Sequence, residues 1–348
     1  WRIDSLAIIS ETPFERGSWC DRINLRDFIR RNYTAYEGDS AFLVGATERT
    51  ERLWRNVRTL MDQEAEKGGT LDVDASTVSD ITAHNPGYID KDSELIVGLQ
   101  TDAPLKRSIM PFGGIRVVEK ACDAYGYKLD DRVREIFTEY RKTHNDGVFD
   151  VYSPEIRAAR KAGIITGLPD AYGRGRIIGD YRRLALYGLD VLIGDKENQK
   201  TSYCASVIDE DAIQAREEIE DQLRALRKLG KMAENYGFDI SKPARNAQEA
   251  IQWTYFAYLA AVKQQDGAAM SLGRVSTFLD IYIEKDMAEG RLSESQAQEL
   301  IDDFVIKLRM VRFLRTPEYK ALFSGDPTWV TEVIGGMCID GRTLVTKT

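Results

Sequence analysis

The residues best suited to chemistry lie in one segment, residues 167–183, with the sequence GLPDAYGRGRIIGDYRR. Glycine permits backbone conformations that other residues rarely adopt, and a guanidinium group can hold a carboxylate or phosphate through two parallel hydrogen bonds. The apolar spacing after the glycines predicts a helix over residues 177–193, whose first N–H groups favour a nearby anion. We therefore predict an anion site with Arg174 or Arg176 as its binding group. The segment contains four arginines, Arg174, Arg176, Arg182 and Arg183.

Two other interpretations of this segment stay open on residue types alone. The arginines could pair with Asp170 and Asp180 in a structural network, which composition favours over a ligand site. Alternatively, Gly173, Gly175 and Gly179 could form a dinucleotide-binding turn. Such a turn requires a preceding strand, and the candidate GIIT at residues 163–166 is separated from the glycines by a turn containing proline.

The composition is that of a globular protein with a large core. The 348 residues are 43% hydrophobic and 30% charged, with a net charge of −8, so we expect no nucleic-acid partner. No apolar run is long enough to cross a bilayer, so we expect no membrane partner. The cysteines form no CxxC motif, which predicts reduced thiols and a cytoplasmic protein. These cysteines are Cys20, Cys122, Cys204 and Cys338.

Histidine chemistry is limited because the chain has only two histidines, His84 and His144. We predict no metal site, and neither histidine lies near a GxSxG nucleophile motif. Each is interpreted as a hydrogen-bonded histidine of a loop or helix end.

Periodicity and capping residues predict a chain rich in helices. Strands are expected at residues 163–166, 267–273 and 328–336. No repeat or flexible linker interrupts the chain, which predicts one α/β unit over residues 1–348. The expected helices cover residues 24–33, 46–69, 130–145, 153–163, 209–237, 246–266 and 293–314, with a short one from residue 316.

Several long blocks closely resemble the pyruvate formate-lyase family of glycyl radical enzymes. They include GLPDAYGRGRIIGDYRR, NAQEAIQWTYFAYLAAVK, GLQTDAPLKRSIMPFGGI and KLRMVRFLRTPEYKALFSGDPTWVTEVIGG. The resemblance implies an acyltransferase that converts pyruvate and coenzyme A to acetyl-CoA and formate by a radical mechanism. It also implies the family's fold, a ten-stranded α/β barrel, of which this chain would supply about one half.

The resemblance assigns site residues in this chain. It places the pyruvate carboxylate on Arg176, with apolar walls from Ala268, Phe323 and Trp329. It places the adenine ring of coenzyme A on Phe149. An arginine stays charged at any working pH, and apolar walls strengthen its ion pair by excluding water.

This sequence departs from the family pattern at the reactive groups. It contains neither an adjacent cysteine pair nor a glycyl radical segment resembling RVSGYAV, so no residue is assigned a catalytic role and no metal is expected. We therefore expect an amino-terminal portion of the family's enzyme that is inactive alone. Residues 209–236 also differ visibly from the family.

The resemblance further implies partners: a radical S-adenosylmethionine activating enzyme, and a second copy in a homodimer that serves anaerobic glucose fermentation. Three alternatives remain open from the sequence. The chain could belong to a close glycyl radical relative that acts on 2-ketobutyrate or another small substrate. It could be a natural, non-catalytic half-protein that needs a partner chain. Without the resemblance, it would be a helix-rich α/β protein with an anion site.

Overall fold

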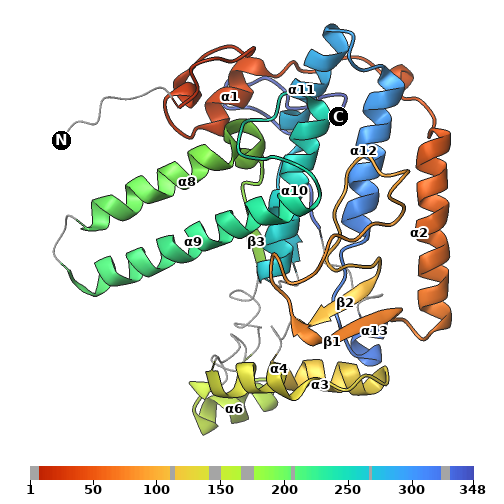
Figure 1. Cartoon of the computed structure of the whole chain (residues 1–348), viewed down its shortest axis with the longest axis vertical. Coiled ribbons are helices and arrows are strands. Elements are labelled where there is room, and N and C mark those ends of the chain that lie inside the picture. Colours follow the sequence, from red (N-terminus) through yellow and green to blue (C-terminus); the bar gives the residue numbers. More distant parts are fainter. Residues whose placement is uncertain are drawn as a thin grey trace.

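The computed structural model describes residues 8–109, 114–140, 150–165, 176–204, 208–265, 269–322 and 330–348. It describes the backbone alone at Arg176, Ile177, Cys204, Gln265 and Ala269. Within these ranges the chain is rich in helices, as expected (Figure 1). The α-helices are α1 (Leu25–Asn32), α2 (Glu48–Glu66), α3 (Ile115–Ala124), α4 (Asp131–Glu135), α6 (Pro154–Lys161), α8 (Arg182–Cys204), α9 (Glu210–Asn235), α10 (Ala247–Gln265), α11 (Ser276–Ala288), α12 (Glu294–Arg309) and α13 (Pro317–Leu322).

Capping residues set several helix starts where the sequence predicted them. The Ser153 hydroxyl accepts a hydrogen bond from the Ile156 N–H at 3.3 Å, and Pro154 is the first residue of α6. Ser293 and Gln296 form a complete capping box at the start of α12. The end of α12 was predicted wrongly, because the helix stops at Arg309 rather than near residue 314.

The helix α10 lies at the centre of the main hydrophobic core. Trp253, Phe256 and Ala260 are buried on one face, and residues on its other faces, including Tyr255 and Leu259, are buried too. A helix buried on nearly all sides must be packed by neighbours in every direction. Figure 1 shows α11 and α12 beside α10, and α8 and α9 as an antiparallel pair extending to one side.

The strands of the described chain form two parallel pairs. The strand β1 (Asp72–Val78) pairs with β2 (Lys106–Ile109), and the sequence analysis anticipated neither. The strand β3 (Arg176–Ile178) pairs with β4 (Ala269–Ser271), and β4 was predicted. The strand predicted at residues 163–166 is wrong for its described part: Gly163 lies in a turn, followed by the exposed Ile164 and Ile165.

No helix among the described residues is long and apolar enough to cross a membrane.

Candidate functional site

Three chain segments far apart in sequence run parallel at the candidate site. Arg176 in β3 lies opposite Ala269 in β4, and Ile178 lies opposite Ser271. Beyond β4, Gly273 forms a parallel bridge with Glu332. The Leu272 N–H donates to the Thr331 carbonyl at 2.8 Å, and the Val333 N–H donates to the Gly273 carbonyl at 2.7 Å. The chain around residue 332, inside the predicted strand at 328–336, therefore extends the β3–β4 pair on its β4 side.

The described residues locate only part of the predicted site. Arg176 is the first residue of β3, where its backbone pairs with β4. The other four predicted residues lie outside the described ranges; they are Phe149, Ala268, Phe323 and Trp329.

The prediction that a helix begins directly after the glycine–arginine segment is wrong. Residues 176–178 form β3, and α8 begins only at Arg182. The backbone N–H groups at the start of β3 belong to a sheet and not to a helix terminus, so the helix-terminus part of the predicted anion site is wrong too. The dinucleotide-turn interpretation also loses support, because residues 163–165 supply no strand before the glycines.

The arginines that open α8 pair with a carboxylate, as the structural-network interpretation predicted. Arg182 Nε lies 2.7 Å from Asp180 Oδ1, and Arg183 Nε lies 3.8 Å from Asp180 Oδ2. Arg182 also donates from Nη1 to the Arg274 carbonyl at 2.9 Å, which ties α8 to the loop before α11. Asp170 and Arg174 lie outside the described residues.

A buried pair of tyrosines, Tyr181 and Tyr258, connects α10 to β4. The Tyr258 hydroxyl, on α10, donates to the Met270 carbonyl in β4 at 3.1 Å. The Tyr181 ring packs edge-on against Tyr258, with ring centroids 5.3 Å apart. Burial raises the pKa of Tyr258, so its hydroxyl stays protonated and remains a donor. Sequence reasoning missed both tyrosines, although the apolar setting of Tyr258 in YFAYLAAV signals a core residue.

Glu332 fixes the third parallel segment to α11. Its carboxylate accepts hydrogen bonds from the Val275 N–H at 2.7 Å and the Ser276 N–H at 3.1 Å, so it caps the start of that helix. Burial raises the pKa of Glu332. No local motif reveals this cap, because Glu332 lies more than 50 residues from Val275 and Ser276 in sequence.

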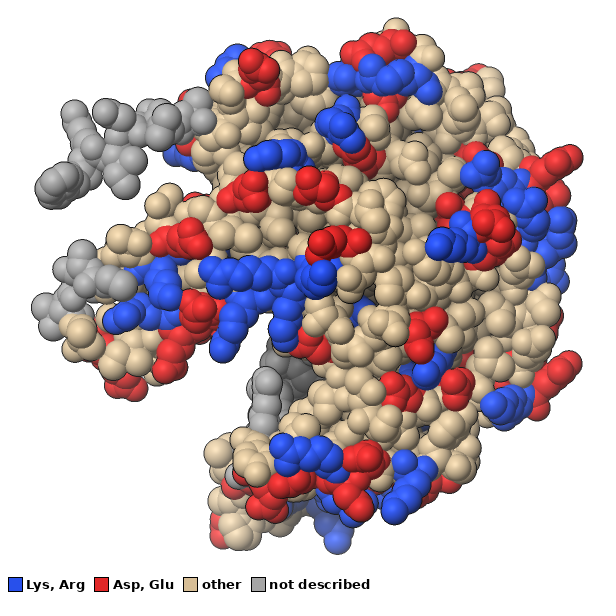
Figure 2. Space-filling model, viewed as in Figure 1, with Lys and Arg blue, Asp and Glu red and all other residues tan. Residues whose placement is uncertain are grey.

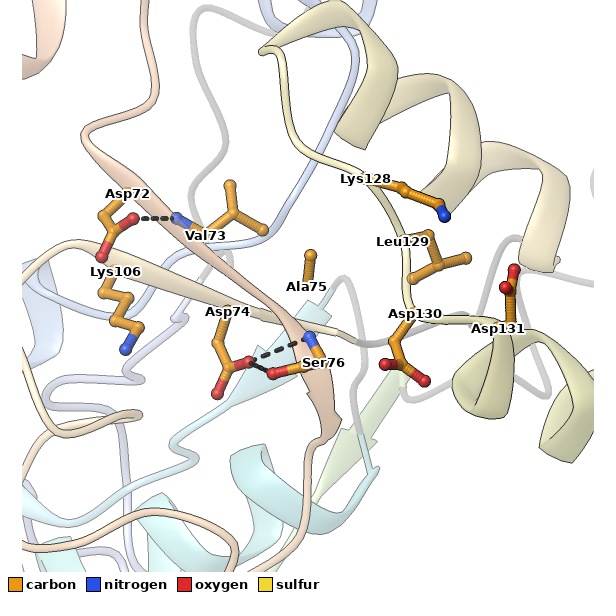
Figure 3. A pocket seen from close by; sticks show the side chains of 10 residues that line it. All are labelled: Asp72, Val73, Asp74, Ala75, Ser76, Lys106, Lys128, Leu129, Asp130 and Asp131. Carbon is orange, nitrogen blue, oxygen red and sulfur yellow. Dashed lines mark hydrogen bonds between the residues drawn. The ribbon is translucent and has the colours of Figure 1, made fainter.

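A second pocket, of about 500 Å³, has the wrong charge for a carboxylate substrate (Figure 3). Four aspartates and two lysines line it, so acidic groups predominate. Two of the aspartates are occupied in local turns and caps: Asp74 accepts from the Ser76 N–H at 3.0 Å, and Asp130 accepts from the Arg132 N–H at 2.7 Å. Among the described residues, no group of three or more His, Cys, Asp or Glu side chains is placed to hold a metal ion.

His84 is a hydrogen-bonded loop histidine, as predicted. Its Nε2 lies 3.0 Å from Asp74 Oδ2. Burial lowers the pKa of His84 despite this carboxylate. Burial opposes ionisation of Asp74, but hydrogen bonds from Ser76, Thr77 and His84 outweigh burial and lower the Asp74 pKa to about 2. His144 lies outside the described residues.

One of the described thiols, that of Cys122, is held in its protonated form. Cys20, Cys122 and Cys338 are free cysteines, and the first two are buried. Burial raises the pKa of Cys122 to about 11, which disfavours the nucleophilic thiolate.

The molecular face seen in Figure 2 is hollowed between the α8–α9 pair and the group of α3, α4 and α6. Basic side chains border this hollow along α9. Three basic residues of α9 have carboxylate partners: Arg227 lies 3.4 Å from Glu197, Lys228 lies 2.6 Å from Asp80, and Lys231 lies 2.7 Å from Glu234.

Comparison with solved structures defines the class of fold. The chain superposes on the glycerol-bound, B12-independent glycerol dehydratase of Clostridium butyricum with a TM-score of 0.67 and 19% identity, covering 89% of this chain and 45% of that chain. It also superposes on a structure described for 1,2-propanediol dehydration in Roseburia inulinivorans, with a TM-score of 0.65 and 20% identity. That match again covers 89% of this chain and 45% of the other chain. These likenesses establish the fold alone, and they confirm the predicted helix-rich α/β class.

The sequence then identifies the family. The pyruvate formate lyase-like family matches residues 18–348, and the chain belongs to it. The chain is 61% identical over 338 residues to "Formate acetyltransferase" of Haemophilus influenzae, and 60% identical over 338 residues to "Formate acetyltransferase 1" of Escherichia coli. Each match covers 96% of this chain but 44% of the relative, so the chain spans less than half of these relatives' length.

Proposed function

We propose that this chain supplies the pyruvate-binding part of a formate acetyltransferase. The observation that carries the proposal is the identity of 60–61% over 96% of the chain to two proteins of that name. In the proposed reaction the bond between the carboxylate and carbonyl carbons of pyruvate breaks. The acetyl group passes to the sulfur of coenzyme A, and the carboxylate leaves as formate with the hydrogen that the thiol gives up.

The strand register supports a common location for three of the proposed pyruvate-binding residues, Arg176, Ala268 and Trp329. Arg176 lies opposite Ala269, the residue directly after Ala268. The third parallel segment is bridged to the β4 side at Glu332, three residues after Trp329. Residues at the starts of adjacent parallel strands share one edge of a sheet. We propose that Arg176 binds the pyruvate carboxylate there, and that Ala268, Phe323 and Trp329 exclude water.

Coenzyme A is the proposed second substrate, and Phe149 is the residue we assign to its adenine ring. We assign no phosphate contact to α9, because the basic side chains named above already have carboxylate partners. In the family, the one-electron chemistry is supplied by a glycyl radical in a segment that this sequence does not contain. This chain's proposed part is therefore to bind and orient the substrates and to keep water away.

The wider setting of the enzyme is also proposed. A radical S-adenosylmethionine enzyme would activate the complete gene product, which would act as a cytoplasmic homodimer in anaerobic fermentation. We further propose that the 348 residues alone do not convert pyruvate, because they include neither an adjacent cysteine pair nor a radical glycine segment.

An anaerobic assay of the activated complete gene product tests this function. We expect equal amounts of acetyl-CoA and formate from pyruvate and coenzyme A, and neither product from the 348-residue chain. Faster turnover of 2-ketobutyrate would reassign the substrate. Dehydration of glycerol or 1,2-propanediol without formate release from pyruvate would place the protein with the dehydratases. Formate release by the 348-residue chain would refute the proposal that it is inactive alone.

A further inference from the structure

A separate pocket of about 550 Å³ lies between α1, the start of α8, the loop before α11 and residues 337–344. This volume is within the usual range of small-molecule sites. Its lining contains five guanidinium groups and a single carboxylate, that of Asp180, although the chain as a whole is acidic. The five arginines are Arg26, Arg30, Arg182, Arg183 and Arg274.

The helices bring these arginines to one place from distant parts of the sequence. Arg26 and Arg30 are four residues apart on α1, a spacing that puts both on one face of the helix. Arg182 and Arg183 open α8, where the N-terminal end of the helix adds positive potential. Arg274 enters from the loop before α11.

Carboxylates neutralise only part of this charge. Asp180 is shared by Arg182 and Arg183, and Asp27, which is outside the pocket lining, pairs with Arg30 at 3.1 Å. The Glu332 carboxylate also interacts electrostatically with Arg182. Within the described part of the chain, Arg26 and Arg274 have no ion pair.

Arg274 brings an unpaired hydrogen-bond donor to the pocket lining. Its Nε is buried and has no hydrogen-bond partner among the described residues. A buried donor without an acceptor costs free energy, which a bound anion would recover. Residue 336 is a glycine, so no side chain crowds this guanidinium. A Cβ at residue 336, where φ is 93°, would lie only 3.1 Å from Arg274 Nη2.

We propose that this pocket binds a polyvalent phosphate group of a small molecule. A monocarboxylate such as pyruvate presents one charge, whereas a phosphate or pyrophosphate presents several and can accept paired hydrogen bonds from more than one guanidinium. Apolar side chains, including Ile29, Met337 and Leu344, line the remainder of the pocket, so an organic part of the ligand would contact them. This site uses none of the residues proposed above for pyruvate.

Isothermal titration of the complete gene product with sodium pyrophosphate and with inorganic phosphate tests the site. We expect saturable binding, tighter for pyrophosphate and weakened by added salt. Arg274→Gln and Arg26→Gln should each lower the pyrophosphate affinity at least about tenfold, the loss expected for a charge-assisted hydrogen bond. Arg58→Gln is the matched control, since Arg58 is an exposed arginine on α2 outside the pocket.

Three results would contradict the proposal: no saturable heat at millimolar pyrophosphate, unchanged affinity in Arg26→Gln, or an equal loss in Arg58→Gln. Circular dichroism verifies folding, and if Arg274→Gln does not fold, the exposed Arg26 on α1 still decides the test. Because Arg176→Gln should leave pyrophosphate binding intact, the outcome is independent of the proposed pyruvate site.

Discussion

At the scale of single residues, two side chains hold the candidate site together: the Glu332 carboxylate caps α11, and the Tyr258 hydroxyl donates to β4. Asp180 as the partner of Arg182 and Arg183 was among the open interpretations, because an acid close in sequence is an obvious candidate. The sequence analysis did not anticipate that the Glu332 carboxylate caps α11, or that the Tyr258 hydroxyl donates to the Met270 carbonyl in β4. Glu332 reaches partners more than 50 residues away, and Tyr258 reads simply as part of an apolar helix.

Asp303, on α12, is a buried carboxyl that should influence stability. One oxygen accepts from the backbone N–H groups of Leu95 and Ile96, and the other is buried without a partner among the described residues. Burial raises the pKa of Asp303 to about 6, although the Lys307 ammonium, itself paired with Glu94, opposes the rise. The folded chain therefore holds a proton on Asp303 that the unfolded chain releases near pH 4.

This difference predicts a pH dependence of unfolding. The protonated Asp303 carboxyl stabilises the folded chain. This contribution to the free energy of unfolding is fully present below pH ~4 and is lost as the pH rises through about 6. Asp303→Asn keeps a carbonyl acceptor for Leu95 and Ile96 but cannot titrate, so its free energy of unfolding should fall less over this interval. Urea unfolding across the interval measures the slope, with the exposed Glu66→Gln on α2 as the control. Equal slopes for wild type and Asp303→Asn would contradict the assignment.

At the scale of elements, local signals predicted helices well and strands poorly. Two local signals each predict a helix start from a few neighbouring residues: Ser153 with Pro154 for α6, and Ser293 with Gln296 for α12. The strand β3 was mistaken for the start of a helix, because two isoleucines before a helical pattern fit either structure. The strand β4 was predicted, but it lies about 90 residues further along the chain, and only the folded chain reveals that it pairs with β3.

The chain bends sharply at Gly188, inside α8. The helical periodicity of residues 177–193 predicted a continuous helix there and gave no sign of the bend. The Gly188 φ of 74° and ψ of 165° are not helical, and the next residue, Leu189, donates its N–H to the Ile240 carbonyl. A Cβ at residue 188 would lie 2.5 Å from the carbonyl carbon of Lys242. The bend thus requires glycine both for its dihedral angles and for its close contact with residues 241–242.

We therefore expect Gly188→Ala to lower the free energy of unfolding by about 2–4 kcal/mol, from backbone strain and steric overlap. Gly194 offers a matched control in the same helix, because a Cβ there meets no atom within 4 Å. Gly194→Ala should raise stability by about 0.5–1 kcal/mol through helix propensity. Thermal and urea unfolding compare the two variants, and equal stability of both would show that α8 tolerates a side chain at the bend.

At the scale of the whole molecule, the fold places charge of opposite sign in separate pockets. The aspartate-lined pocket beside β1 and the arginine-lined pocket beside α1 lie within one acidic chain. Net charge alone predicted neither, because composition averages over surfaces that the fold separates. The family could be named from long sequence blocks, whereas the geometry of the proposed pyruvate site depends on Arg176 and on three residues outside the described ranges, Ala268, Phe323 and Trp329.

The pyruvate KM of an Arg176 variant in the activated complete gene product tests the central claim most directly. Removing the charged partner of a bound carboxylate costs about 3 kcal/mol, roughly a hundredfold in affinity. Arg176→Gln should therefore raise the pyruvate KM roughly a hundredfold and leave the coenzyme A KM nearly unchanged, whereas Arg58→Gln should change neither. An unchanged pyruvate KM in Arg176→Gln would remove this arginine from the site and contradict the account.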